Sequence, residues 1–433
     1  MGTCRSLLLP AAVAALLILH GCGGTNRTTN PFPEVAPPGT VVRSAKARNT
    51  APVVSAADMA ALAAGNREFA CALYQRLARG DGNLVFSPLS ISTALAMAYA
   101  GARGDTATQL ADALHFRLPA ERLHAAFNRL DLSLEPTGAD GGKQLTLNVL
   151  NALWTQQGWS YLDSFLDTLS VNYDAGMHEM DFANDRESAR QAINQWVSEA
   201  TEGRIPELIP AGALDESVRM ILTNAIYFRA YWASQFDEAA TRDQAFHRLD
   251  GTQVTVKMMH QTQSLGYRRG DGYRAVSLPY FADKQSMVVV LPDEGAFGRV
   301  SDAVDGDWVA ALRAGLEATP VDLGFPRFEF AASASLADVL QALGATDAFS
   351  AERADFSGIT GHRDLYIQQV RHKAFISVNE KWTEAAGATD VEFGETSVPM
   401  AEPVTVDRPF IFFIVDNGTG AVLFVGRVLD PTA

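Results

Sequence analysis

Cysteine is scarce in this chain of 433 residues, which contains only three. Cys4 and Cys22 lie close to the N-terminus, so Cys71 is the one cysteine in the remaining sequence. We therefore expect no disulfide bond inside the folded part, and no C-x-x-C pair suggests a metal or redox site. Cys71 lies in an apolar helical pattern and is interpreted as a small core residue.

Signatures of catalysis are also missing. The chain has no G-x-S-x-G nucleophile elbow, no H-E-x-x-H helix and no phosphate-binding glycine loop. Its eight histidines are scattered, and paired acids such as Glu199 and Glu202 are explained as solvated helix ends. The sequence therefore argues against an enzyme and predicts neither a metal nor a cofactor.

Positive charge is in short supply. The formal net charge is −15, and residues 1–57 carry a net +4, so residues 58–433 carry −19. A domain with this charge repels nucleic acid and anionic membranes. We expect no nucleic-acid partner and no activation by heparin or another polyanion.

Long apolar runs are confined to the N-terminus, and no later run reaches the roughly 18 residues of a membrane helix. Arg5, the apolar stretch 7–19 and the small residue Gly21 predict a secretory signal peptide over residues 1–21. Because Cys22 follows directly, the segment resembles the lipid-attachment site of bacterial lipoproteins, in which the cysteine thiol receives lipid. This interpretation predicts an outer-membrane or cell-surface lipoprotein. The alternative is an ordinary signal peptide and an extracellular product.

The next segment is poor in periodic hydrophobic residues. Residues 22–57 are rich in Thr, Asn, Pro, Ala and Val and include Pro31-Phe32-Pro33 and Pro37-Pro38. We predict a disordered tether here. A single domain is expected over residues 58–431.

The body combines helical and strand patterns around one core. Apolar residues at helical spacing follow Asp58, a predicted N-cap, and a second helical pattern covers 187–201. Buried strands are predicted over the apolar runs 145–154, 220–228, 287–291, 410–415 and 422–428. Since helices dominate early and strands late, the pattern predicts an α+β architecture.

Short motifs recur along the body in a specific order. They are 83–92 (NLVFSPLSIS), 101–106 (GARGDT), 194–205, 223–228 (TNAIYF) with Trp232, 372–375 (HKAF), 379–380, 383–389 (TEAAGAT), 407–410 (DRPF) and 423–428 (LFVGRV). Any one of them is weak, but together they resemble the serpin family over residues 58–431. The resemblance implies a fold with large mixed or antiparallel sheets, about eight or nine helices and an exposed reactive loop at about 380–405.

The resemblance also implies a mechanism. A serpin is a suicide substrate: the target protease cleaves the loop, the loop inserts into the main sheet as a new strand, and the acyl-linked protease is distorted. The expected partner is therefore a serine or cysteine protease, bound covalently one to one to a monomeric inhibitor.

The loop sequence can be tested for its ability to form an inserted strand. Alternate residues form an uncharged set, namely Thr383, Ala385, Gly387, Thr389, Val391 and Phe393. The interleaved set carries the acids, namely Glu384, Ala386, Ala388, Asp390, Glu392 and Gly394. A strand with one face buried needs this period of two. The pattern therefore predicts an insertable strand, with an exposed edge strand or polar loop as the alternative.

One residue departs from the family pattern. Trp382 occupies a place where family hinges usually have glycine, which permits the backbone rotation that starts insertion. Slow insertion would make the chain a substrate. The alternative function is accordingly a non-inhibitory serpin-fold surface or binding protein.

Three bonds are candidates for cleavage. Counting from Glu380 places the bond at Thr396-Ser397, whereas counting back from Pro409 points nearer Val398. The third candidate is Met400-Ala401. These uncharged residues suit elastase-like or chymotrypsin-like proteases. No Arg or Lys lies between 382 and 407, which disfavours trypsin-like targets.

The resemblance further assigns residues that control opening of the sheet. The buried cluster beneath the sheet (the shutter) corresponds to Ser87, Ser90, Asn224 and His372. The top of the sheet, where insertion begins (the breach), corresponds to Trp232 and Glu380. The hinge corresponds to Glu380, Trp382, Thr383, Glu384, Ala385, Ala386, Gly387, Ala388 and Thr389. Taken alone, His372 is interpreted as a core histidine and not as a catalytic base.

Overall fold

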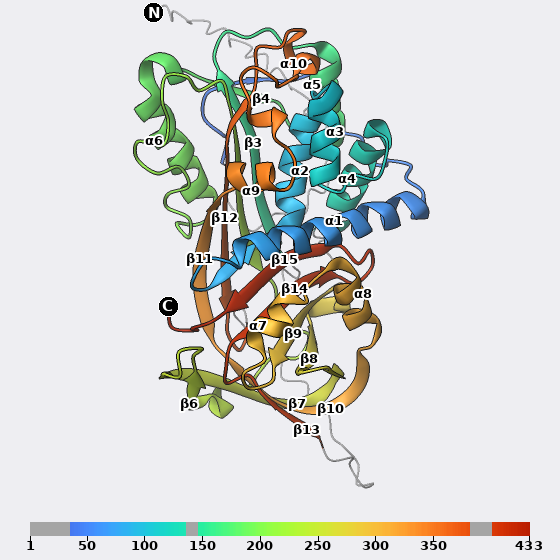
Figure 1. The fold of residues 1–433 in the computed structure, drawn as a ribbon, viewed down its shortest axis with the longest axis vertical. Helices are drawn as coiled ribbons and strands as arrows, with labels where there is room; N and C mark the ends of the chain where they lie inside the picture. Colours follow the sequence, from blue (N-terminus) through green and yellow to red (C-terminus); the bar gives the residue numbers. More distant parts are fainter. Residues whose placement is uncertain (1–34, 136–145, 382–400) are drawn as a thin grey trace, which may run out of the picture.

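A computed structural model describes residues 35–135, 146–381 and 401–433. These residues form ten α-helices and two mixed β-sheets, which confirms the predicted α+β architecture (Figure 1). The resemblance implied about eight or nine helices, and the ten observed include three short ones, α7, α9 and α10. The helices are α1 (Ala56–Leu77), α2 (Pro88–Tyr99), α3 (Gly104–Ala113), α4 (Ala120–Leu134), α5 (Asp163–Tyr173), α6 (Phe182–Ala200), α7 (Phe297–Asp302), α8 (Gly306–Ala314), α9 (Ala337–Ala342) and α10 (Ser357–Thr360).

The first sheet, called the main sheet, has six strands in the order β1-β4-β3-β5-β12-β11. Its fourth and fifth strands in this order, β5 and β12, are parallel neighbours, and β5 is antiparallel to β3. In chain order the strands are β1 (Thr40–Val42), β3 (Thr146–Gln156), β4 (Met177–Met180), β5 (Met220–Arg229), β11 (Phe328–Ser335) and β12 (Ile367–Val378).

The second sheet follows the order β13-β10-β7-β8-β9-β14-β15-β2, with β6 paired to β7. Its strands β9, β14 and β15 are buried along their whole length, as the continuous apolar runs predicted. The strands are β2 (Leu84–Phe86), β6 (Arg242–His247), β7 (Gln253–Gly270), β8 (Tyr273–Pro279), β9 (Gln285–Pro292), β10 (Glu317–Pro326), β13 (Glu402–Thr405), β14 (Phe410–Asp416) and β15 (Val422–Val428).

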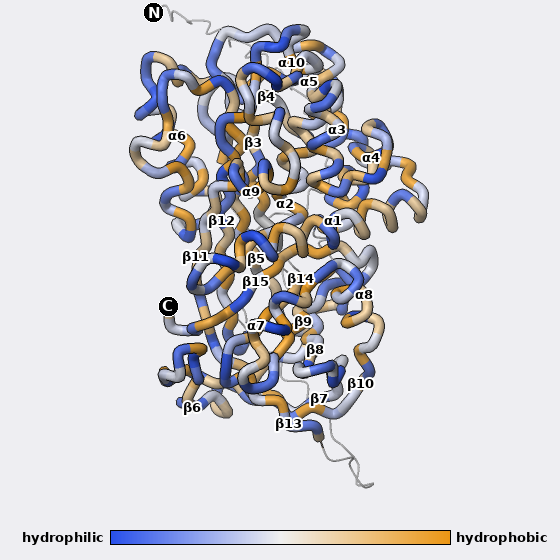
Figure 2. The backbone as a smooth tube through the Cα atoms, viewed as in Figure 1, coloured by the Kyte–Doolittle hydropathy of each residue, from blue (hydrophilic) through white to orange (hydrophobic). Residues whose placement is uncertain are grey.

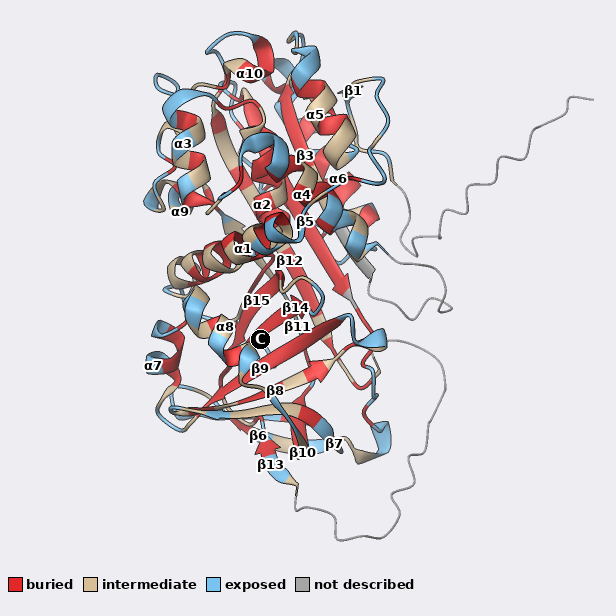
Figure 3. Ribbon diagram, turned by 90° about the vertical axis from the view of Figure 1, so that its right-hand side faces the viewer, coloured by how far each residue is buried: buried red, intermediate tan, exposed pale blue. Residues whose placement is uncertain are grey.

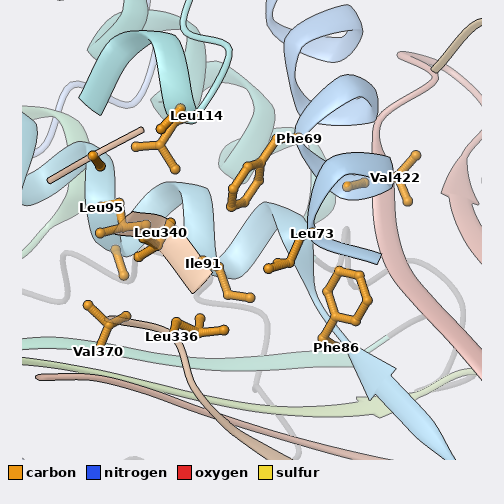
Figure 4. Close-up of a cluster of buried hydrophobic side chains, with 14 of the residues drawn as sticks. Phe69, Leu73, Phe86, Ile91, Leu95, Leu114, Leu336, Leu340, Val370 and Val422 are labelled. Atoms are coloured by element: carbon orange, nitrogen blue, oxygen red, sulfur yellow. The ribbon is translucent and has the colours of Figure 1, made fainter. Parts of the chain in front are cut away.

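Two apolar clusters connect these layers. One lies between the sheets and includes residues of β5, β9, β12 and β14. The other packs α1 and α2 against the main sheet and β15, where Phe69, Ile91, Leu95, Val370 and Val422 converge (Figure 4). Figures 2 and 3 show that the hydrophobic and buried residues follow the strands, whereas outer helices such as α3 and α6 expose polar turns. The main sheet is therefore backed by a continuous core.

The predicted boundary between tether and domain differs in the structure. We expected a disordered tether over residues 22–57, but residues 35–55 lie against the domain and contribute β1 to the main sheet. Helix α1 begins at Ala56, and Ser55, not Asp58, is its N-cap. The side chain of Asp58 instead pairs with Arg122 of α4.

Two expectations about the body can be compared with the structure. Cys71 is buried in α1, and burial raises the pKa of its thiol to about 12, so it has no thiolate character near neutral pH. Within the described ranges, no helix is long and apolar enough to cross a membrane.

Candidate functional site

Strands β5 and β12 of the main sheet are parallel neighbours, and the boundary between them is called here the seam. The register runs from Met220 opposite Ile367 to Tyr227 opposite Phe375. A segment that folded back from the end of β12 would run antiparallel to both strands. Admitting it requires β5 and β12 to move from about 4.8 Å apart to about twice that distance. Parallel pairing is slightly weaker per residue than antiparallel pairing, so this seam is a favourable place to part the sheet.

A polar cluster lies under the seam, where α2 meets β5 and β12. The structure brings together all four predicted shutter residues, each 2% exposed or less. The Ser87 amide donates to Nε2 of His372 at 3.3 Å, and Nδ1 of His372 contacts Oδ1 of Asn224. The Asn224 amide nitrogen donates to Oγ of Ser90 and to Oδ1 of Asn151. Asn151 of β3 is a fifth member that the sequence analysis missed.

The protonation state of the cluster follows from its geometry. Because a backbone N–H must donate, Nε2 of His372 accepts, so Nδ1 carries the proton that it gives to Asn224. Burial lowers the pKa of His372 to about 3, which keeps the ring neutral at pH 7. The histidine thus links β12 to β5 and to the start of α2. Both ring nitrogens are engaged in these buried contacts, in agreement with the interpretation of His372 as a core residue.

The end of the seam nearest the loop is closed by Trp232 and Glu380. The indole of Trp232 stacks on Tyr280 at 4.7 Å between centroids, and its Nε1 donates to the carbonyl of Asn379 at 2.9 Å. Glu380 is 2% exposed and pairs with Arg327 at 2.5 Å and with the Thr241 hydroxyl. Both predicted breach residues therefore hold the chain where it leaves β12.

The charge of Glu380 is stabilised in place. Burial raises the pKa of its carboxyl, but hydrogen bonds from Arg327 and Thr241 lower it more, so the pKa lies below its usual value. The group is ionised at neutral pH. Movement of the chain after Glu380 into the seam would require these contacts to break or stretch.

The connection between α6 and β5 crosses the outer face of the seam, a feature that the sequence analysis did not predict. Arg204 lies over the ring of Phe375 at 5.3 Å and pairs with Glu329 at 3.3 Å. The Lys373 ammonium donates to the carbonyl of Glu207 at 2.8 Å, and the Gln369 side chain to a further carbonyl of this connection. Inserting a strand would require this connection to shift.

Most of the predicted loop lies outside the described residues. The residues outside the described ranges include the hinge residues Trp382, Thr383, Glu384, Ala385, Ala386, Gly387, Ala388 and Thr389 and the cleavage candidates Thr396, Ser397, Val398 and Met400. Near the N-terminus, Cys22 also lies outside them. Ala401 is described and lies half-buried directly before β13. In the ranges that the structure covers, no group of His, Cys, Asp and Glu side chains is arranged to hold a metal ion.

The main sheet thus combines a parallel seam between β5 and β12, a buried polar cluster beneath that seam and the Trp232 and Glu380 contacts at its end. Comparison with known proteins specifies the family. A family model described as "Serpin (serine protease inhibitor)" matches residues 64–431, and the chain belongs to the serpin family.

Individual relatives agree with this assignment. An uncharacterized serpin-like protein of Thermococcus kodakarensis is 40% identical over 363 residues, which cover 83% of each chain. Human leukocyte elastase inhibitor is 35% identical over 395 residues, covering 86% of this chain and all of the relative. The crystal structure of a thermophilic serpin, tengpin, in the native state superposes with a TM-score of 0.76 at 28% identity, covering 84% of this chain and 93% of that one.

Proposed function

We propose that this serpin is a suicide-substrate inhibitor of serine or cysteine endopeptidases. The observation that carries the proposal is the parallel pairing of β5 with β12, since a segment that folds back from the end of β12 would run antiparallel to both strands once they part. The alternating uncharged and acidic residues from Thr383 onward supply a segment of the required pattern. Cleavage of the loop would release that segment to insert, carrying the acyl-linked protease with it.

The proposed targets are elastase-like or chymotrypsin-like. Support comes from the uncharged residues around Thr396, Val398 and Met400 and from the absence of Arg and Lys between 382 and 407. The similarity to leukocyte elastase inhibitors of several vertebrates points the same way. Trp382 at the hinge is the feature that favours the alternative, a non-inhibitory serpin cleaved as a substrate.

Incubation with a protease panel tests the proposal. The full chain is mixed with pancreatic elastase, neutrophil elastase, chymotrypsin and subtilisin and analysed on denaturing gels. We expect a denaturant-stable band of serpin plus protease with at least one enzyme. The mass of the released C-terminal peptide then identifies the cleaved bond. Loop cleavage across the panel without any such band would contradict inhibition and support the alternative.

We also propose that Cys22 carries lipid and tethers the protein to the outer membrane or the cell surface. The arm that follows it, residues 35–55, lies at the opposite end of the molecule from β13, the strand after the loop (Figure 3). Only residues 23–34 separate the lipid from the ordered chain, a reach of at most about 40 Å. The end of the molecule at β13 would then face away from the membrane. Cell fractionation with the mass of the N-terminal peptide tests this, and a freely soluble protein with unmodified Cys22 would contradict it.

A further inference from the structure

Residues 35–55, called here the N-terminal arm, bind a surface at the edge of the main sheet. Within the arm, β1 pairs antiparallel with β4, with Thr40 opposite Glu179 and Val42 opposite Met177. Strand β4 would otherwise present an open edge to solvent on this side. The arm therefore extends the half of the sheet that lies on the β5 side of the seam.

Two glycines fit the arm closely to this edge. A Cβ on Gly176 would lie 2.7 Å from the carbonyl oxygen of Val42 and 2.8 Å from the Cβ of Arg43, both in the arm. Gly39 has φ +82° and runs against the backbone of Glu179. Only residues without a side chain permit this approach. The close packing of the arm against the edge of β4 therefore depends on glycine at both positions.

Charge complementarity continues the contact along α4 and α5. The arm carries three basic residues, and the surface under them carries four acids. The pairs are Arg43–Asp174 at 2.6 Å, Lys46–Asp167 at 2.7 Å, Arg48–Asp131 at 2.5 Å and Arg48–Glu135 at 3.1 Å. Exposed ion pairs contribute little individually, but here they lie on one segment that is also bound by backbone hydrogen bonds.

The arm joins elements on the two sides of a boundary that must move. Near its start, the carbonyl of Val35 accepts from Nε1 of Trp196 in α6, which packs on β3. Near its end, Asn49 bonds to Val171 of α5 and Asn128 of α4, and the chain then enters α1. Helix α1 in turn packs on α2, α4, β15 and α8. Parting the seam would displace β5, β3 and β4, with α6 on β3, relative to β12 and β11, and the arm connects this half of the sheet to α4, α5 and α1.

We infer that the edge of β4 and the acidic sides of α4 and α5 form a docking surface for the N-terminal arm, and that the docked arm slows opening of the main sheet. The inference rests on the insertion step of the proposed function. An occupied surface holds the β5 half of the sheet against the body, so the seam parts less often. An arm released from the surface leaves only the contacts within the sheet to resist opening.

Two variants of the full chain release the arm in different ways. Gly176→Ala places a methyl group against the arm backbone, and Gly298→Ala is its control, because a Cβ at Gly298 meets nothing within 4 Å. The triple variant Arg43→Glu, Lys46→Glu, Arg48→Glu repels the arm from its acidic partners. Amide hydrogen exchange at residues 40–42 reports whether the arm has left. A fluorescent peptide with the sequence of residues 383–396 reports opening through its rate of annealing into the sheet.

We expect annealing about ten-fold faster in both arm variants and unchanged in Gly298→Ala. An added peptide of residues 35–52 should slow annealing in the triple variant, whose docking surface is intact, but not in Gly176→Ala, whose surface is blocked. Rates within two-fold of the parent, with the arm shown to be released, would overturn the inference and leave the inhibitor proposal standing. Faster annealing without a protease complex in any protein would support the arm and contradict the inhibitor. A peptide that anneals to none of the proteins would contradict both.

Discussion

Replacing Thr383 with arginine is expected to abolish the covalent protease complex while leaving cleavage of the loop intact. Thr383 is the first member of the uncharged alternate set. When the loop inserts between β5 and β12, this set has to face the core behind the main sheet. Burying an unpaired guanidinium there costs several kcal/mol, so insertion should fall behind deacylation. We expect the ratio of complex to cleaved product on denaturing gels to drop about 100-fold or more.

The neighbouring residue provides a matched control. Glu384 belongs to the interleaved set, which already carries three acids and would face away from the core. Glu384→Arg should therefore change the ratio of complex to cleaved product less than about three-fold, since an exposed charge change has a small effect. Unimpaired trapping by Thr383→Arg, or equal losses in the two variants, would count against insertion in the predicted register.

Removing the side chain of Asn224 is expected to destabilise the native protein strongly. Asn224→Ala deprives Ser90, Asn151 and His372 of a buried hydrogen-bond partner at once. Each buried polar group left unpaired costs about 1–3 kcal/mol. We expect the free energy of unfolding, measured by denaturant titration, to fall by about 3 kcal/mol or more. We also expect the loop peptide to anneal faster, because the cluster links the two strands that must part.

An asparagine outside the cluster is the appropriate comparison. Asn172 is half-buried, and its amide bonds only to Thr168 of its own helix. Asn172→Ala should change the free energy of unfolding by no more than about 0.5 kcal/mol. Similar losses in the two variants, or an Asn224→Ala protein as stable as the parent, would show that the cluster does not hold the seam.

The elements with strong local patterns could be predicted from the sequence. The apolar runs 220–228 and 422–428 became β5 and β15 nearly residue for residue, because a strand buried on both faces needs a continuous apolar run. Ser87, Asn224 and His372 could be grouped because family motifs surround each of them. The three residues are in contact in the structure.

Features that depend on distant partners could not be predicted in this way. Asn151 is a polar residue in an apolar strand, and its role appears only when the register sets it opposite Asn224. The arm has no periodic pattern of its own, since its order comes from β4 and from acids more than 80 residues further along the chain. Ser55 and Asp58 are both good N-cap residues, and only the pairing of Asp58 with Arg122 decides between them.

Thermal unfolding before and after loop cleavage tests most directly whether the main sheet accepts its own loop. The full chain is cleaved in the loop, separated from the protease and compared with uncleaved protein and with cleaved Thr383→Arg. An inserted strand of about fourteen residues adds two hydrogen-bonded ladders to the centre of the sheet, so we expect the Tm of the cleaved protein to rise by roughly 20 °C or more. The cleaved Thr383→Arg protein should remain near the uncleaved value. An unchanged or lower Tm after cleavage of the parent would contradict insertion, and with it the proposed mechanism of inhibition.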